Sequence, residues 1–211
     1  MRSRPGERIY VDIDDVLACT IEGLVALLEE THGRSVDVED VLYFDLEKSF
    51  GLSDSEIGPF MDRAHRDDQL EAIVPTPGAA LVLSHWASLG REVHLVTGRP
   101  PTTNAASKRW LSYHGIEHEA LHHLDKWSRP SWNETGLQAI RFEDLHEYRF
   151  AFAVEDSLET AIRLVEDYDI QVALMDRPWN RDLESVTPET RSRLVRCQGW
   201  GAVSTFFDER S

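Results

Sequence analysis

The chain has 211 residues, with 38 acidic and 22 basic side chains and a formal net charge of −16. This length suits one domain with a small insertion. The acidic surplus argues against binding to nucleic acid polymers and to anionic membranes, because both need a basic surface. No apolar run approaches the length of a transmembrane helix. An anionic ligand would therefore need a local positive site, built from a lysine, a metal or backbone N–H groups.

The two cysteines, Cys19 and Cys197, do not have metal-ligand spacing. The charged N-terminal residues lack the apolar segment of a secretory signal. We therefore expect a reducing, cytoplasmic environment. The oligomeric state stays open, a homodimer being one option.

The first strand signal lies in residues 8–13, an apolar run that ends among three carboxylates, Asp12, Asp14 and Asp15. Ile, Tyr and Val in a run of this length indicate a buried parallel strand. Strand periodicity places Asp12 and Asp14 on one side and Ile13 on the other. Like charges held together at a strand end need a cation or a shared proton. An ordinary Asp-rich turn that caps the next helix is the alternative.

The rest of the chain alternates between strand and helix patterns. Strands are predicted over residues 8–13, 92–96, 119–124, 149–154 and 170–175. Helices are predicted over residues 17–31, 53–67, 78–89, 102–113 and 157–167, with a short helix or turn in 36–50, an irregular stretch in 127–133 and a last helix in the tail. No strand is expected between residues 18 and 75. This order predicts an α/β fold, a Rossmann-like doubly wound parallel sheet with helices inserted after the first strand.

Polar side chains follow three later strands, at Thr97-Gly98, at Lys126 and at Glu155-Asp156. Each has an ordinary explanation when taken alone: a turn hydroxyl, a solvated lysine and a helix N-cap. Lys108 is the nearest other lysine, but it falls inside a predicted helix. The carboxyl ends of parallel strands meet at one edge of a sheet, so these groups are expected to gather with Asp12 and Asp14.

The motif Asp12-Ile13-Asp14-Asp15-Val16 resembles the first motif of the haloacid dehalogenase superfamily, and the later groups follow in that superfamily's order. The resemblance covers most of residues 8–180. Within the superfamily the chain looks most like the 5′(3′)-deoxyribonucleotidase branch. The segments that suggest this are Val-Asp-Ile-Asp-Asp-Val-Leu, Val-Thr-Gly-Arg, Asp-Lys and Asp-Arg-Pro-Trp-Asn.

The resemblance implies a phosphatase that works through an aspartyl-phosphate, with a small-molecule phosphate ester as substrate. Asp12 would be the nucleophile and Asp14 the general acid and base. Mg²⁺ would be held by the Asp12 carboxylate, the Asp14 carbonyl and Asp156. The groups expected to bind the phosphoryl oxygens are Thr97, Gly98 and Lys126. Two residues, Glu155 and Asp15, depart from the usual pattern of the superfamily. Both are expected to orient the metal ligands without binding the metal directly.

The resemblance also implies that residues 18–75 form a small helical cap over a core of residues 1–17 and 76–211. Nucleoside 5′-monophosphates or deoxynucleotides are the expected substrates. Phe44 and Arg99 are the candidate substrate contacts. Tyr43, Phe50 and Phe60 are also aromatic, and any of the four aromatics can instead belong to the core of the cap.

Three alternatives remain open from the sequence. The first is a phosphatase or phosphotransferase acting on another small ester, such as a sugar phosphate. The second is a non-catalytic binding or regulatory protein on the same fold, with Glu155 as the sign of lost catalysis. The third is a zinc site among His114, His118, His122 and His123, although only the first pair has the spacing of one helix face.

Overall fold

The computed structural model describes residues 6–126 and 139–208, and the irregular stretch expected at 127–133 lies outside them. Seven strands in the described residues form one parallel sheet in the order β4-β3-β2-β1-β5-β6-β7. The strands are β1 (Arg8–Val11), β2 (Glu92–Thr97), β3 (Ala120–Asp125), β4 (Ile140–Arg141), β5 (Phe152–Glu155), β6 (Gln171–Met175) and β7 (Leu194–Cys197). The predicted doubly wound α/β fold is confirmed, with β1 at the centre.

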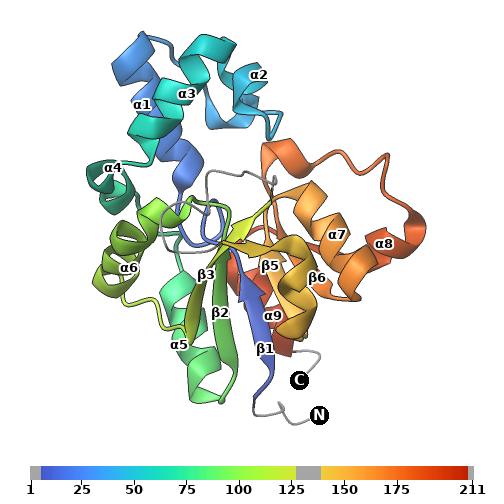
Figure 1. The fold of residues 1–211 in the computed structure, drawn as a ribbon. Coiled ribbons are helices and arrows are strands. Elements are labelled where there is room, and N and C mark those ends of the chain that lie inside the picture. The colour runs from blue at the N-terminus through green and yellow to red at the C-terminus, as the bar shows by residue number, and fades with distance from the viewer. Residues whose placement is uncertain (1–5, 127–138, 209–211) are drawn as a thin grey trace.

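Helices connect these strands and cover both faces of the sheet (Figure 1). The α-helices are α1 (Thr20–His32), α2 (Leu46–Phe50), α3 (Asp54–Ala64), α4 (Asp67–Ala72), α5 (Ala79–Ser88), α6 (Asn104–Tyr113), α7 (Leu158–Tyr168), α8 (Pro188–Ser192) and α9 (Trp200–Asp208). Short 3₁₀ helices are η1 (Val38–Asp40), η2 (Pro101–Thr103), η4 (Phe142–Glu147) and η5 (Pro178–Asn180). The last helix expected in the tail is α9.

The central strand β1 shows how the core is divided. Its alternate side chains point to opposite faces, as strand geometry requires. Ile9 and Val11 join an apolar cluster with α5 and α9 on one face. Tyr10 joins a second cluster with α7 and η4 on the other face. Because both faces are covered by helices, nearly every residue of β1 is apolar and buried.

The helices α1 to α4 lie between β1 and β2 in sequence and have an apolar cluster of their own. Figure 1 shows α1, α2 and α3 beyond one end of the sheet, while both termini lie at the opposite end. We call the segment from α1 to α4 the cap. It contains no strand, as expected. The chain enters and leaves it side by side, because Ala18 forms an antiparallel bridge with Pro75, the Cys19 N–H donates to the Val74 carbonyl (2.9 Å) and the Thr76 N–H donates to the Leu17 carbonyl (2.7 Å).

The helix expected over residues 53–67 is confirmed as α3, including the capping box of Ser53 and Glu56, but it ends at Ala64 and a second helix, α4, begins at Asp67. Arg66 has an extended backbone (φ −68°, ψ 149°), which separates α3 from α4. The break allows α4 to pack on α6, where Arg109 donates to Glu71 (2.7 Å) and Asp67 (2.6 Å). This tertiary contact outweighs the helical pattern that continues through the local sequence.

A pair of stacked histidines lies on the α7 side of the sheet. His94 of β2 and His122 of β3 have ring centroids 5.3 Å apart and planes within 7° of parallel. The His94 Nδ1 and His122 Nε2 atoms are 3.1 Å apart, so one ring donates a hydrogen bond to the other. Tyr148 and Phe150 contact the pair edge-on. Only one proton fits between the two facing nitrogens, so the two rings cannot both be charged in this arrangement.

This pair should make the fold less stable in mild acid. Burial, followed by the neighbouring His94 and His123, lowers the pKa of His122 to about 4. Burial and Arg8 also lower the pKa of His94, although Glu92 lies 3.9 Å from its Nε2 atom. An unfolded histidine titrates near 6.5, so below that pH the unfolded chain binds protons that the folded chain excludes.

We expect the free energy of unfolding to fall by roughly 1 kcal/mol between pH 7.5 and pH 5 through His122, because solvent screens this half-buried ring and reduces the full effect of its lowered pKa. Urea unfolding at the two pH values measures this fall. A His122→Gln variant should show a smaller fall than the native chain, whereas the matched variant of exposed His118 should show the native fall. Equal falls in all three proteins would contradict the assignment.

Candidate active site

The polar groups predicted at four strand ends meet at one edge of the sheet. Asp12 directly follows β1, Thr97 ends β2, Lys126 follows β3 and Asp156 follows β5. Because β1 pairs in parallel with β2 on one side and β5 on the other, these ends lie next to one another. β1 itself stops at Val11, two residues before the predicted end, and the chain turns away at the carboxylates.

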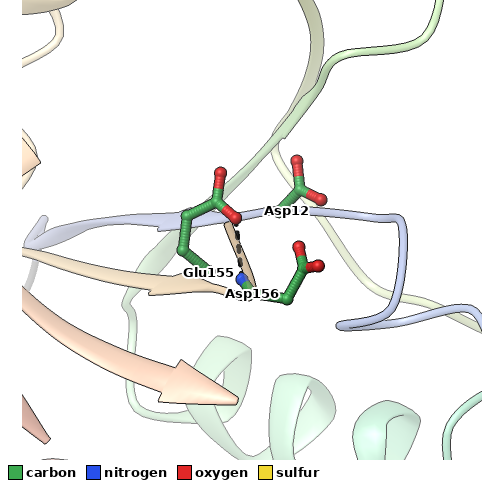
Figure 2. Close-up of side chains that lie close together, drawn as sticks. All are labelled: Asp12, Glu155 and Asp156. Atoms are coloured by element: carbon green, nitrogen blue, oxygen red, sulfur yellow. Dashed lines mark hydrogen bonds between the residues drawn. The ribbon is translucent and has the colours of Figure 1, made fainter. Parts of the chain in front are cut away.

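Three buried carboxylates form the centre of this edge. One oxygen from each of Asp12, Glu155 and Asp156 lies within 4.8 Å of the others. Figure 2 shows the three side chains gathered at the ends of β1 and β5. The Lys126 ammonium, also buried, lies 2.6 Å from Glu155 Oε1 and 3.3 Å from Asp12 Oδ1. A single lysine therefore faces three acidic groups.

Glu155 is held entirely by neighbours within the core. Its Oε2 atom accepts the backbone N–H groups of Asp156 (2.7 Å) and Ser157 (2.9 Å), just before α7 begins. Its Oε1 atom accepts from Lys126 and from the Tyr10 hydroxyl (3.3 Å). With both oxygens engaged, Glu155 acts as a fixed anion that positions Lys126.

The remaining carboxylates, Asp12 and Asp156, fit a hard divalent cation. Burial raises the pKa of each well above its usual value, Lys126 opposes the shift, and Glu155 adds to it. A cation would remove this cost, since oxygen ligands are the ones that Mg²⁺ prefers. Within the described residues, this cluster is the one group of metal-binding side chains that lies close enough together.

Asp14 is bound to the core and to the cap at once. Arg99 forms a forked ion pair with it, through Nη2 to Oδ1 at 2.7 Å and Nε to Oδ1 at 2.9 Å. The hydroxyls of Thr20, the first residue of α1, and of Thr97 also donate to it, at 2.6 and 3.3 Å. Burial favours the neutral acid, but Arg99 and Thr20 outweigh it and lower the pKa of Asp14. Arg99 is buried against this carboxylate and still lines the cavity described below.

Asp15 fixes the turn that follows β1. It has a left-handed backbone (φ 55°), a conformation that Asp tolerates better than most residues. Its carboxylate accepts the Ile21 N–H at 3.0 Å and so binds the start of α1. Arg177 donates from Nε to the Asp15 carbonyl at 3.0 Å. Burial raises the pKa of Asp15 to about 7, against the hydrogen bond from Ile21.

The segment η5 supplies contacts that sequence reasoning missed. The Trp179 indole N–H donates to Asp156 Oδ2 at 2.9 Å, and the Asn180 amide donates to the Asp156 carbonyl at 2.7 Å. From the sequence, residues 176–180 contributed to the resemblance to the deoxyribonucleotidase branch. The signal available was the position of the segment after a strand of the same sheet, which brings it to the same edge.

A cavity of about 580 Å³ opens between this edge and the cap. Its floor contains Asp12, Asp14, Gly98, Lys126 and Asp156. Its upper part is mainly apolar and is formed largely by cap side chains, among them Leu24, Leu27, Val41, Leu46, Ile57 and Met61. A volume of this size suits a small-molecule ligand with several rings or chains of atoms.

The candidate aromatic residues divide into two groups. Phe50 and Phe60 pack edge to face at 5.8 Å in the core of the cap, so for these two the core interpretation is right. Phe44 and Tyr43 line the cavity and keep 46% and 56% of their surface exposed. They are the aromatic side chains of the cap that a ligand can reach.

The histidines do not form the zinc site considered above. The His123 Nδ1 atom lies 2.9 Å from the Arg99 carbonyl oxygen, and the His118 Nδ1 atom lies 2.9 Å from the Ile116 carbonyl oxygen. His122 stacks on His94, and His114 packs beside Trp110. None of them belongs to the metal-binding group found in the described part of the chain.

Comparison with solved structures gives matches over nearly the whole chain. A predicted phosphatase from Clostridium acetobutylicum is 11% identical, with 98% of this chain and 100% of that chain covered and a TM-score of 0.64. D,D-heptose 1,7-bisphosphate phosphatase from B. bronchiseptica, solved with magnesium and phosphate, is 15% identical, with 97% and 99% covered and a TM-score of 0.51. The chain therefore shares its fold with these two proteins.

Comparison with curated proteins gives a relative from Halalkalibacterium halodurans named "Putative nucleotidase BH1399". It is 26% identical over 209 residues, which cover 99% of this chain and 96% of the relative. No protein-family model matches the sequence. In the described residues, no helix has the length and apolar character needed to cross a membrane.

Proposed function

We propose that the chain is a Mg²⁺-dependent phosphomonoesterase that acts through an aspartyl-phosphate, with nucleoside 5′-monophosphates or deoxynucleotides as substrates. The observation that carries the proposal is the floor of the cavity. There the Asp12 carboxylate lies beside Lys126 and a second buried carboxylate, Asp156, under a space large enough for a small ester. The fold and the nucleotidase relative support the same reaction class.

In the first half-reaction, an Asp12 oxygen attacks phosphorus and the bond from phosphorus to the leaving oxygen breaks. Lys126 and the backbone at Gly98 bind the phosphoryl oxygens, where charge redistributes in the transition state. Thr97 supports the same position, since its hydroxyl accepts the Arg99 N–H (3.1 Å) and fixes this turn. The products of this step are the free alcohol and a phosphorylated Asp12.

Asp14 supplies the proton to the leaving oxygen and then takes a proton from the water that attacks the phosphorylated Asp12. Its lowered pKa suits the second role, because an ionised carboxylate can act as a base. In the first role the Asp14 carboxyl group must carry a proton, so the Arg99 guanidinium has to release this carboxylate before the reaction. The phosphate dianion of a substrate is the anion that competes for Arg99.

Asp12, Asp156 and the Asp14 carbonyl would hold Mg²⁺. Glu155 and Asp15 would position these ligands without binding the ion directly. When bound, the ion lowers the repulsion between the Asp12 carboxylate and the phosphate dianion. The D,D-heptose 1,7-bisphosphate phosphatase from B. bronchiseptica, which was solved with magnesium and phosphate, has the same fold.

The division into a core of residues 1–17 and 76–211 and a cap of residues 18–75 is part of the proposal. The apolar upper part of the cavity favours a base over a sugar as the group that the cap selects. Sugar hydroxyls set against these apolar side chains, rather than against the polar lining residues Asp45, Glu47, His65 and Gln69, would lack partners, each at a cost of about 1–3 kcal/mol. Phe44 and Tyr43 offer ring faces at the same cavity.

The test is phosphate release by the full chain, with Mg²⁺ or with a chelator, from nucleoside 5′-monophosphates, glucose 6-phosphate and p-nitrophenyl phosphate. We expect release only with Mg²⁺, and a kcat/KM for the best nucleotide about tenfold or more above that for the sugar phosphate, as one or two unpaired hydroxyls would give. A preference for the sugar phosphate would establish that alternative instead. Metal binding without release from any ester would favour the non-catalytic protein.

A further inference from the structure

Asp156 differs from the other two clustered carboxylates in what holds its side chain. Asp12 and Glu155 are held by Lys126, a residue of the sheet edge. Asp156 is held by η5, whose Asn180 binds its backbone carbonyl and whose Trp179 binds its Oδ2 atom. Asn180 is fully buried and also binds the Met175 carbonyl (2.7 Å), so this end of η5 is fixed to the core.

Trp179 is attached to the cap as well as to Asp156. Its ring is partly buried and packs against the apolar cluster of the cap, which contains residues of α1, α2 and α3. The 3₁₀ helices η5 and η1 also contact each other. Beside them, Arg181 forms an ion pair with Glu39 of η1 at 2.7 Å. The position of the Trp179 ring therefore depends on how the cap lies on the core.

We propose that Trp179 is a positioning residue that couples the seating of the cap to the orientation of Asp156, and so to the affinity for Mg²⁺. The inference rests on the proposed function, because it takes Asp156 as a ligand. The indole N–H binds Oδ2, so Oδ1 is the oxygen of this carboxylate that we take to bind the metal. When the cap is seated, the ring cannot turn, and the carboxylate is held in one orientation.

The coupling has to work in both directions. If the seated cap raises the affinity for Mg²⁺, then Mg²⁺ must favour the seated cap by the same factor. Residues that orient a metal ligand from behind commonly change metal affinity by about 10–100-fold. Mg²⁺ should therefore slow amide exchange in the parts of the cap that contact η5, around residues 38–52, in the absence of any substrate.

The test uses Trp179→Phe, which keeps an aromatic ring against the cap and removes the N–H donor together with one ring of the indole. The matched control is Trp110→Phe, because the Trp110 indole also makes one hydrogen bond between the core and the cap region, to the Ile73 carbonyl at 2.7 Å. Titration calorimetry with MgCl₂ alone measures affinity in the native chain and both variants. Hydrogen exchange with and without MgCl₂ measures protection of residues 38–52.

We expect Trp179→Phe to bind Mg²⁺ about tenfold more weakly and to lose the Mg²⁺-dependent protection of the cap. Trp110→Phe should keep native Mg²⁺ affinity and protection. Native affinity in Trp179→Phe, or equal weakening in both variants, would overturn the inference and leave the proposed function in place. A native chain that neither binds Mg²⁺ nor releases phosphate would overturn the proposed function, and this inference with it.

Discussion

Replacing Asp12 with asparagine should reduce phosphate release at least about 10⁴-fold, the scale of loss when a nucleophile in a catalytic group is removed. The amide oxygen is a poor nucleophile towards phosphorus, and the change also removes one of the two proposed carboxylate ligands of Mg²⁺. Single-turnover assays with acid quenching measure the loss and test for phosphorylated protein. Native turnover in this variant would contradict the aspartyl-phosphate mechanism.

The same substitution should make the metal-free protein more stable. Asp12 is 2% exposed and shares its site with Glu155 and Asp156, so its charge is costly. In chelator we expect Asp12→Asn to gain about 1 kcal/mol, or about 2–4 °C in Tm. Asp14→Asn is the matched control, because it should lose about 1–3 kcal/mol by leaving Arg99 without its carboxylate. Equal Tm changes in the two variants would show that the two aspartates do not differ in this way.

Replacing Lys126 with methionine should have the largest effect on stability. Lys126 is the cation that faces both Asp12 and Glu155, and its side chain is only 6% exposed. Removing one partner of such a buried group leaves uncompensated charge and costs about 3–5 kcal/mol. Activity should also fall about 10²–10³-fold, since a donor to the phosphoryl oxygens is lost. Chemical unfolding in chelator and phosphate release with Mg²⁺ measure the two effects.

A second substitution separates charge balance from catalysis. Lys126→Met with Glu155→Gln removes the partner charge but keeps an oxygen for the Asp156 and Ser157 N–H groups. This double variant should recover about 1–3 kcal/mol and none of the activity. Lys108→Met, at an exposed position on α6, should stay within about 0.5 kcal/mol of the native chain. A Lys126→Met variant as stable as Lys108→Met would contradict the ion-pair network.

The centre of the site could be predicted from the sequence because it lies at strand ends. Parallel strands bring such ends together whatever the loops do, so the order Asp12, Thr97, Lys126 and Asp156 was enough to place them at one edge. The central strands were found because each is a buried apolar run bounded by polar residues. The observed ends of these strands differ from the predicted ends by one to three residues, because side-chain contacts decide where a strand stops.

The outer strands and the cap contacts could not be predicted in the same way. β4 has two residues, and β7 is a half-buried edge strand with Arg196 in it, so neither has a clear apolar run. Thr20 contacts Asp14 across the boundary between cap and core, and Trp179, which binds Asp156 within the core, packs against the cap. Such contacts depend on how two separately packed clusters meet, and no local pattern of residues records that.

The two chain segments that join the cap to the core are paired at Ala18 and Pro75, and this pairing has a consequence for how proteins of this fold can diverge. Both ends of the inserted segment leave the sheet at one point, so the sheet places no demand on the length of chain between them. Insertions, deletions or a wholly different set of helices can be exchanged there as a unit without changing strand order or register. Chemistry at the strand ends can thus stay constant through evolution while the part that chooses the substrate is replaced.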